Sequence, residues 1–225
     1  MTAAQAGRAE PGVPGWLADL ARSARAMAVP DAMRPPPGGG RRSAILILLG
    51  TGPAGPDVLL VQRSASLRNH AGQPAFPGGA VDDGDDGAVA AALREAAEEA
   101  LVDPAGVQVL TVLPEMYISR SGYRVSPVLA WWREPGPVAP GNPAEVTAVA
   151  RVALADLADP ANRMMVRYPS GQPGPAFRAG PMLVWGFTAF LLDRLLALGG
   201  WELPWDAATV SEPPGGISLA GPGPS

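Results

Sequence analysis

The residues best suited to chemistry are the three glutamates and the arginine of the segment Arg94-Glu95-Ala96-Ala97-Glu98-Glu99. In a helix, Glu95 stands one turn before Glu98 and Glu99, so all three carboxylates project from one side. Such carboxylates repel one another unless a cation neutralises them. Because every donor is an oxygen and the chain has no cysteine, the pattern favours a hard ion, Mg²⁺ or Mn²⁺. For the glutamates alone, a solvated acidic helix face is the competing interpretation.

A glycine turn, Phe76-Pro77-Gly78-Gly79, precedes the acidic segment. Consecutive glycines let backbone amides and carbonyls approach a metal ion or a phosphate without a clash from Cβ. Neither feature is specific by itself. Together, at this separation, they predict one joint site.

The elements that must position this site follow from the hydrophobic pattern. Ala-rich sequence from Gly84 to Leu101 predicts a helix, with the acidic residues of 82–86 supplying its N-cap and first turn. Strands on both sides of this helix predict an α/β fold, namely an α/β/α sandwich with a mixed central sheet. The predicted strands are 44–49 and 58–61, joined by a hairpin at 50–56, then 107–113, 124–132, 146–152 and a weaker 163–168, before a long helix at 183–198.

The two ends of the chain differ from this middle part. Apolar residues at helical spacing over 15–28 and the Pro/Gly run at 35–40 make residues 1–42 an N-terminal helix followed by a linker. Residues 43–203 form the predicted central domain, and the Gly/Pro/Ser-rich residues 204–225 form a predicted disordered tail.

Composition excludes several classes of protein. The net charge of -4 argues against nucleic-acid binding, which needs a basic face to neutralise phosphates. The apolar stretch at 182–198 is too short to span a bilayer and contains Asp193 and Arg194, so no membrane partner is expected. All 17 basic residues are arginines, whose planar fork suits phosphate recognition. We expect a cytoplasmic protein, a monomer or a homodimer, that acts on a small molecule.

The acidic helix and the glycine turn together resemble the motif of the Nudix hydrolases. That motif has a glycine, five residues, an acid, a spacer, then Arg-Glu, two residues and Glu-Glu, and here Gly79, Asp85 and Arg94 stand at those places. The spacer between Asp85 and Arg94 has eight residues where the common motif has seven, as in the coenzyme A (CoA) pyrophosphatase branch. Residues 60–79 are similar to the signature of that branch, and the whole resemblance covers about 43–200.

The resemblance implies roles for the acidic helix. Glu95 and Glu99 correspond to the principal metal ligands, Glu98 assists directly or through water, and the Gly79 carbonyl completes the coordination. Arg94 would pair with a glutamate and hold its rotamer, so Glu98, Glu99 and Arg94 are the residues expected to carry catalysis. An ordinary surface salt bridge is the alternative for Arg94.

Substrate contacts are expected from residues that precede the acidic helix in the sequence and from residues that follow it. Arg63 and Arg68 are candidates for binding phosphates, with Gly78 in the turn and Tyr123 shaping the pocket. Glu145 is a possible further ligand or general base, and His70, the only histidine, is a possible participant. For Arg68, His70 and Glu145, a solvent-exposed or structural role is the alternative interpretation.

The sequence departs from the family pattern at Leu101, where a glycine usually follows the helix. Glycine there serves as a helix C-cap, so we expect its absence to alter the turn before Asp103.

The resemblance implies a Mg²⁺- or Mn²⁺-dependent pyrophosphohydrolase that cleaves CoA or acyl-CoA into 4'-phosphopantetheine, or its acyl form, and adenosine 3',5'-bisphosphate. Two alternatives stay open at this point. One is hydrolysis of another nucleoside diphosphate, such as ADP-ribose or a dinucleotide. The other is a binding module of the same fold that holds a nucleotide without hydrolysing it.

Overall fold

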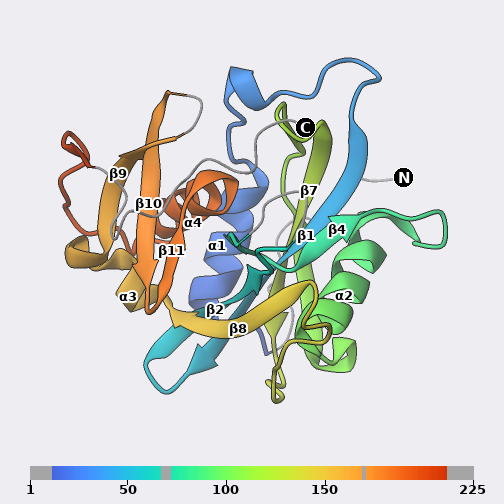
Figure 1. The fold of residues 1–225 in the computed structure, drawn as a ribbon. Helices are drawn as coiled ribbons and strands as arrows, with labels where there is room; N and C mark the ends of the chain where they lie inside the picture. Colours follow the sequence, from blue (N-terminus) through green and yellow to red (C-terminus); the bar gives the residue numbers. More distant parts are fainter. Residues whose placement is uncertain (1–11, 67–71, 169–170, 212–225) are drawn as a thin grey trace, which may run out of the picture.

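The computed structural model describes residues 12–66, 72–168 and 171–211 (Figure 1). The α/β class and the mixed sheet predicted from the sequence are both confirmed. The helices are α1 (Gly15–Arg25), α2 (Gly87–Ala100), α3 (Leu154–Ala158) and α4 (Gly186–Leu198), with 3₁₀ turns at Asp31–Met33, Pro104–Gly106 and Pro160–Asn162. The strands are β1 (Arg41–Gly52), β2 (Gly55–Arg63), β3 (Pro74–Ala75), β4 (Gly78–Ala80), β5 (Val107–Val112), β6 (Met116–Ile118), β7 (Tyr123–Trp132), β8 (Val146–Ala153), β9 (Arg163–Arg167), β10 (Pro173–Ala179), β11 (Met182–Val184) and β12 (Val210–Ser211).

The main sheet has the strand order β3-β2-β1-β7-β5, with β4 paired to β1, β6 to β7 and β8 to β2. The central pair, β1 and β7, is parallel, whereas the other ladders of this sheet are antiparallel. β1 changes partner along its length. Residues 43–45 pair with β4 and residues 49–52 with β2, and between them the Leu46 amide donates to the Pro77 carbonyl at 2.8 Å. The glycine turn is therefore held at the point along β1 where pairing with β4 ends and pairing with β2 has not yet begun.

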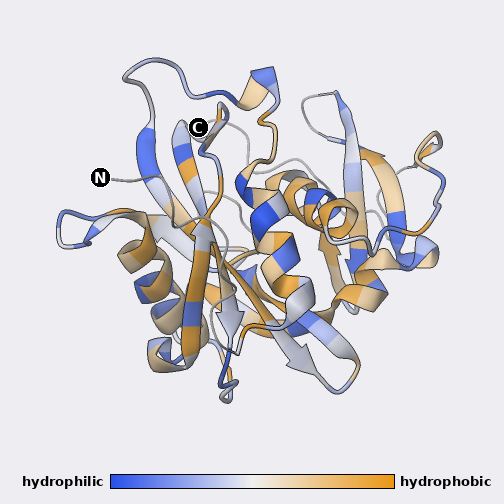
Figure 2. Cartoon of the chain, turned by 180° about the vertical axis from the view of Figure 1, so that it is seen from behind, coloured by the Kyte–Doolittle hydropathy of each residue, from blue (hydrophilic) through white to orange (hydrophobic). Residues whose placement is uncertain are grey.

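Both faces of the main sheet are covered by helices, because alternate residues of its strands are apolar on opposite sides. Ala44, Leu46 and Leu48 of β1 pack with the buried alanines of α2. Ile47 and Leu49 face the other way, into a core shared with α1 and α4. Figure 2 shows the resulting hydrophobic bands in the central strands and on the helices beside them. The alanines of α2 are small, and so this helix can lie close to the strands that carry the glycine turn.

A second sheet, with the order β11-β10-β9-β12, lies beyond α4 (Figure 1). The sequence predicts only its β9 part. The Pro- and Gly-rich β10 has no strand-like pattern, and residues 183–184, predicted as the start of the last helix, instead belong to β11. The helix begins at Gly186, whose φ of +70° follows the extended backbone of Trp185.

The segments flanking the predicted domain pack on it. α1 ends at Arg25, a little earlier than the predicted 28, and buries Leu17, Leu20 and Ala24 in the main core. Residues 204–211, which fall inside the predicted disordered tail, follow a defined path, because β12 pairs in parallel with β9. Residues 212–225 lie outside the described residues.

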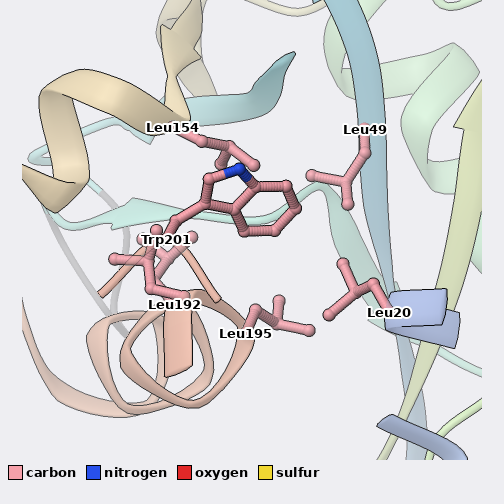
Figure 3. A pocket seen from close by; sticks show the side chains of 7 residues that line it. Leu20, Leu49, Leu154, Leu192, Leu195 and Trp201 are labelled. Carbon is pink, nitrogen blue, oxygen red and sulfur yellow. The ribbon is translucent and has the colours of Figure 1, made fainter. Parts of the chain in front are cut away.

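Trp201, just after α4, joins several elements in one apolar pocket (Figure 3). Its indole packs edge-on against Trp16, with 5.3 Å between ring centroids. The pocket is lined by Leu20, Leu49, Leu154, Leu192, Leu195, Leu196 and Trp201. Because all seven side chains are leucine or tryptophan, this pocket is a packing feature. Within the described part of the chain, no helix combines the length and the apolar character needed to cross a bilayer.

Candidate active site

The acidic helix lies directly against the glycine turn. A Cβ at Gly79 would stand 2.3 Å from Glu95 Oε1, so the carboxylate occupies the space that a side chain would need. The backbone amide of Gly78 donates to Glu99 Oε2 at 3.0 Å. Two of the three predicted carboxylates thus meet at the turn, because β4 pairs with β1 within the sheet and α2 packs on the face of that sheet.

Arg94 connects the helix to the loop that follows the turn. Its Nε and Nη2 donate to the two oxygens of Asp85 at 3.0 and 3.1 Å, a bidentate pair. Its Nη1 donates to Glu95 Oε1 and to Glu98 Oε2, both at 3.0 Å, and its Nη2 also donates to the Ala80 carbonyl. The hydrogen bond with Asp85 raises the pKa of Arg94 and lowers the pKa of Asp85. One guanidinium therefore sets the rotamers of two glutamates.

Asp85 was not among the site residues expected from the sequence. Its fixed place in the motif was the available signal, but its partner depends on how the loop folds back. Of the acidic residues predicted at the start of α2, the N-cap is confirmed, whereas the prediction of acidic first-turn residues was wrong, since the first turn has none. Asp86 occupies the N-cap of α2, yet its side chain makes no capping hydrogen bond.

Glu99 is the most buried carboxylate of the site, with 5% of its side chain exposed, and Arg63 Nη1 donates to its Oε1 at 3.0 Å. Burial raises the pKa of Glu99 to about 7, although the Gly78 amide and Arg63 act in the opposite direction. The charges of Glu95 and Glu145 add to the increase. Burial also raises the pKa of Glu95. Burial therefore disfavours the charged forms of Glu95 and Glu99 in the metal-free site.

The donor set fits a hard divalent cation by its chemistry. Glu95, Glu98 and Glu99 offer only oxygens. Glu95 and Glu99 lie at the glycine turn, and a cation would stabilise the charged forms of both. Among the described residues, however, no three acidic side chains converge on one point. The Glu95 and Glu98 oxygens are bonded to Arg94, so a metal ion would compete with that guanidinium for them.

The loop before β8 covers the end of α2 and carries Glu145. The Glu145 carboxylate is exposed and accepts from Asn142 Nδ2 at 3.0 Å. Its carbonyl accepts from the Ser64 amide at 2.7 Å, beside Arg63. Glu145 is therefore placed next to the Arg63–Glu99 pair by backbone contacts.

Tyr123 is not part of this cluster. It lies at the start of β7, where the Arg41 guanidinium stands 5.2 Å from the centre of its ring. Arg68 and His70 lie outside the described residues. The structure thus brings together Arg63, Gly78, Gly79, Arg94, Glu95, Glu98 and Glu99, with Glu145 alongside.

The expectation that Leu101 alters the end of α2 was wrong. Leu101 adopts φ 57° and ψ 30°, the left-handed conformation that a glycine would take there. Its amide donates to the Ala97 carbonyl at 3.1 Å and the Val102 amide to the Ala96 carbonyl at 3.3 Å. The turn is kept, and Leu101 carries the steric strain of a left-handed residue with a Cβ.

Comparison with known proteins identifies the class to which this fold and site belong. The family model of the NUDIX domain matches residues 40–169, more than half of the chain, and so the chain belongs to the Nudix family. It is similar to the "Uncharacterized Nudix hydrolase NudL" of Escherichia coli K12, with 55% identity over 89 residues, which is 40% of this chain and 45% of that protein. The NudL of Shigella flexneri is 53% identical over 93 residues, covering 41% and 47%. The match thus spans less than half the length of these curated relatives.

Two solved structures are also similar to part of this chain. A Nudix hydrolase of M. smegmatis, RenU, matches with 28% identity and a TM-score of 0.44, covering 53% of this chain and 74% of that one. The NUDIX domain of Shewanella oneidensis NrtR, solved with ADP ribose, matches with 24% identity and a TM-score of 0.42, covering 57% and 80%.

Proposed function

We propose that this chain is a divalent-metal-dependent pyrophosphohydrolase whose substrate is CoA or an acyl-CoA. One observation carries the proposal: the carboxylates of Glu95 and Glu99 lie against the backbone of Gly78 and Gly79, with Arg63 beside them. This arrangement combines oxygen ligands for a cation with donors for phosphate oxygens. Belonging to the Nudix family supports the same reaction class.

The metal would be held by Glu95, Glu98, Glu99 and the Gly79 carbonyl. A bound Mg²⁺ or Mn²⁺ supplies charge neutralisation and lowers the pKa of a water molecule. Arg94 fixes the approach of Glu95 and Glu98 by hydrogen bonds to both, while Asp85 fixes Arg94 in turn. Removing Asp85 should therefore weaken metal binding although Asp85 is not itself a ligand.

Arg63 is the described residue best placed to bind the pyrophosphate. Its side chain is 24% exposed, and its Nη1 is already at Glu99. Its guanidinium carries N–H donors besides the one at Nη1, and this planar fork suits phosphate oxygens. Arg68 is proposed as a second phosphate contact, Gly78 as a backbone contact and Tyr123 as part of the pocket rim.

The CoA assignment is supported by the sequence of 60–79 and by the eight-residue spacer between Asp85 and Arg94. CoA carries a 3'-phosphate besides its pyrophosphate, so it offers anionic partners to more than one arginine. The products would be 4'-phosphopantetheine, or its acyl form, and adenosine 3',5'-bisphosphate. The proposal includes a cytoplasmic location and a monomer or homodimer. His70 is kept as a possible participant.

Glu145 is the proposed general base or further ligand. It is exposed, it is oriented by Asn142, and its charge acts on Glu99. A carboxylate so placed can accept a proton from the attacking water.

A substrate panel tests the proposal. Purified protein is incubated with CoA, dephospho-CoA, ADP-ribose and a dinucleoside polyphosphate, with Mg²⁺, Mn²⁺ or EDTA, and the products are separated. We expect metal-dependent release of adenosine 3',5'-bisphosphate from CoA and weaker cleavage of dephospho-CoA. Preference for ADP-ribose would show that the proposed substrate is wrong, while the proposed metal-dependent hydrolysis would still hold. Absence of turnover with every compound, despite Mn²⁺ binding, would indicate a non-catalytic module.

A further inference from the structure

The segment from Ala139 to Glu145 is attached to the C-terminal end of the catalytic helix α2. The last carbonyls of a helix have no partner within it. Here the Gly141 amide donates to the Glu99 carbonyl at 3.1 Å, and the Ala139 amide donates to the Ala100 carbonyl at 3.4 Å. The loop is therefore bonded to the backbone of a residue whose side chain belongs to the site.

Gly141 is the closest point of this contact. A Cβ at Gly141 would lie 1.9 Å from the carbonyl oxygen of Glu98 and 3.3 Å from Leu101 Cδ2. The first of these neighbours is helix backbone, which cannot rotate away. Since carbon and oxygen approach to about 3.3 Å, a side chain at this position would displace the loop by about 1.4 Å. Only glycine permits the observed close approach of the loop backbone to the helix backbone.

Glu145 is tied rigidly to Gly141 through the next residue, Asn142. The Asn142 carbonyl accepts from the amides of Glu145 and Val146, both at 2.9 Å. Asn142 Oδ1 accepts from the Ala144 amide at 3.1 Å, and Nδ2 donates to Glu145 Oε1 at 3.0 Å. Because these bonds close a compact turn, a shift at Gly141 is transmitted to the Glu145 carboxylate.

We propose that Gly141 is a positioning residue that sets where the Glu145 carboxylate stands relative to Glu99 and Arg63. It does so by allowing the loop of residues 139–145 to pack closely on the C-terminal end of α2. The inference rests on the proposed function, in which Glu145 acts at the metal and phosphate site. It adds a role for a residue outside both the glycine turn and the acidic helix.

The test is a double-mutant cycle between Gly141→Ala and Glu145→Gln, with Gly136→Ala as the matched control. Gly136 lies in the same connection, and a Cβ there meets nothing within 4 Å. Values of kcat and KM are measured with CoA and saturating Mg²⁺, and Mn²⁺ binding is measured by calorimetry. The wild type is assayed first, because its failure to hydrolyse any pyrophosphate would refute the proposed function and this inference with it.

With an active wild type, we expect Gly141→Ala to lower kcat by about ten- to a hundredfold, as displacements of this size do. The KM should stay within about threefold, since uniform binding is unchanged. An unchanged Mn²⁺ dissociation constant would indicate that Glu145 acts as the base, and a weakened one that it is a ligand. Adding Glu145→Gln to Gly141→Ala should cause little further loss, because both changes remove the same contribution. Gly136→Ala should resemble the wild type.

Three results would overturn the inference while leaving the proposed function intact. They are multiplicative losses in the double variant, a Glu145→Gln variant with wild-type turnover, or a Gly141→Ala variant equal to Gly136→Ala. If Gly141→Ala does not fold, Asn142→Ala takes its place, because it removes the bond to Glu145 Oε1 without a backbone clash. Its loss of kcat should likewise not add to that of Glu145→Gln, and wild-type turnover of Asn142→Ala would count against the inference.

Discussion

Replacing Glu99 by glutamine should stabilise the metal-free protein, and the gain should depend on pH. The pKa of Glu99 rises from 4.5 to about 7 on folding, mainly through burial. A carboxyl group with a raised pKa contributes its full stability below its unfolded pKa and loses it as the pH rises through the folded value. The difference of about 2.5 pKa units corresponds to about 3 kcal/mol at 1.36 kcal/mol per unit.

The diagnostic quantity is the change in this gain between two pH values. Arg63 interacts with the charge of Glu99 only where Glu99 is ionised, so its effect is already contained in the raised pKa. Glutamine also differs from a protonated glutamate in packing and hydrogen bonding, and this offset in stability is the same at both pH values. The offset therefore cancels when the difference in unfolding free energy between variant and wild type is compared at about pH 4.5 and about pH 8. The comparison should show the variant gaining about 3 kcal/mol relative to the wild type over this interval.

The assay is urea denaturation of both proteins in EDTA, followed by circular dichroism. Glu98→Gln is the control, because it makes the same chemical change on the same helix at a side chain that is 60% exposed. Adding Mn²⁺ at the higher pH should stabilise the wild type more than Glu99→Gln. A Glu99→Gln effect that does not change with pH would refute the claim that burial of charge strains the metal-free site.

Three further predictions concern steric and packing features. Gly79→Ala should weaken Mn²⁺ binding at least about tenfold, since its Cβ would stand 2.3 Å from Glu95 Oε1, and calorimetry giving a wild-type affinity would contradict this. Leu101→Gly should raise the free energy of unfolding by about 1 kcal/mol by relieving the left-handed strain, whereas Leu101→Ala should bring no such gain in the same urea experiment. Trp201→Ala should lower the melting temperature and cost about 3–5 kcal/mol, because the indole packs among leucines of four elements, and a loss below about 1 kcal/mol would show that the pocket collapses around the smaller residue.

Local sequence was sufficient for the central helix and most strands. The alanine-rich run gave α2 within a few residues of its ends, because helix propensity and a short apolar period act over one or two turns. Short apolar runs bounded by turn residues predicted β1, β2, β5, β7 and β8, because such runs are typical of buried strands. The Pro- and Gly-rich β10 was missed, because its pairing with β9 and β11 outweighs its weak intrinsic preference.

The sequence by itself determined that the three glutamates share one side of a helix and that a glycine turn lies upstream, because both follow from spacing along the chain. Only the tertiary structure decided which partners those groups meet. Asp85 holds Arg94, Arg63 meets Glu99, and Gly141 seats the Glu145 loop on the helix end. These contacts join residues from different elements, and their geometry depends on the partner change of β1 and on backbone approaches that no local pattern encodes. The left-handed turn at Leu101 is of the same kind, because Val102 directly after it is buried in the core although Leu101 itself disfavours this conformation.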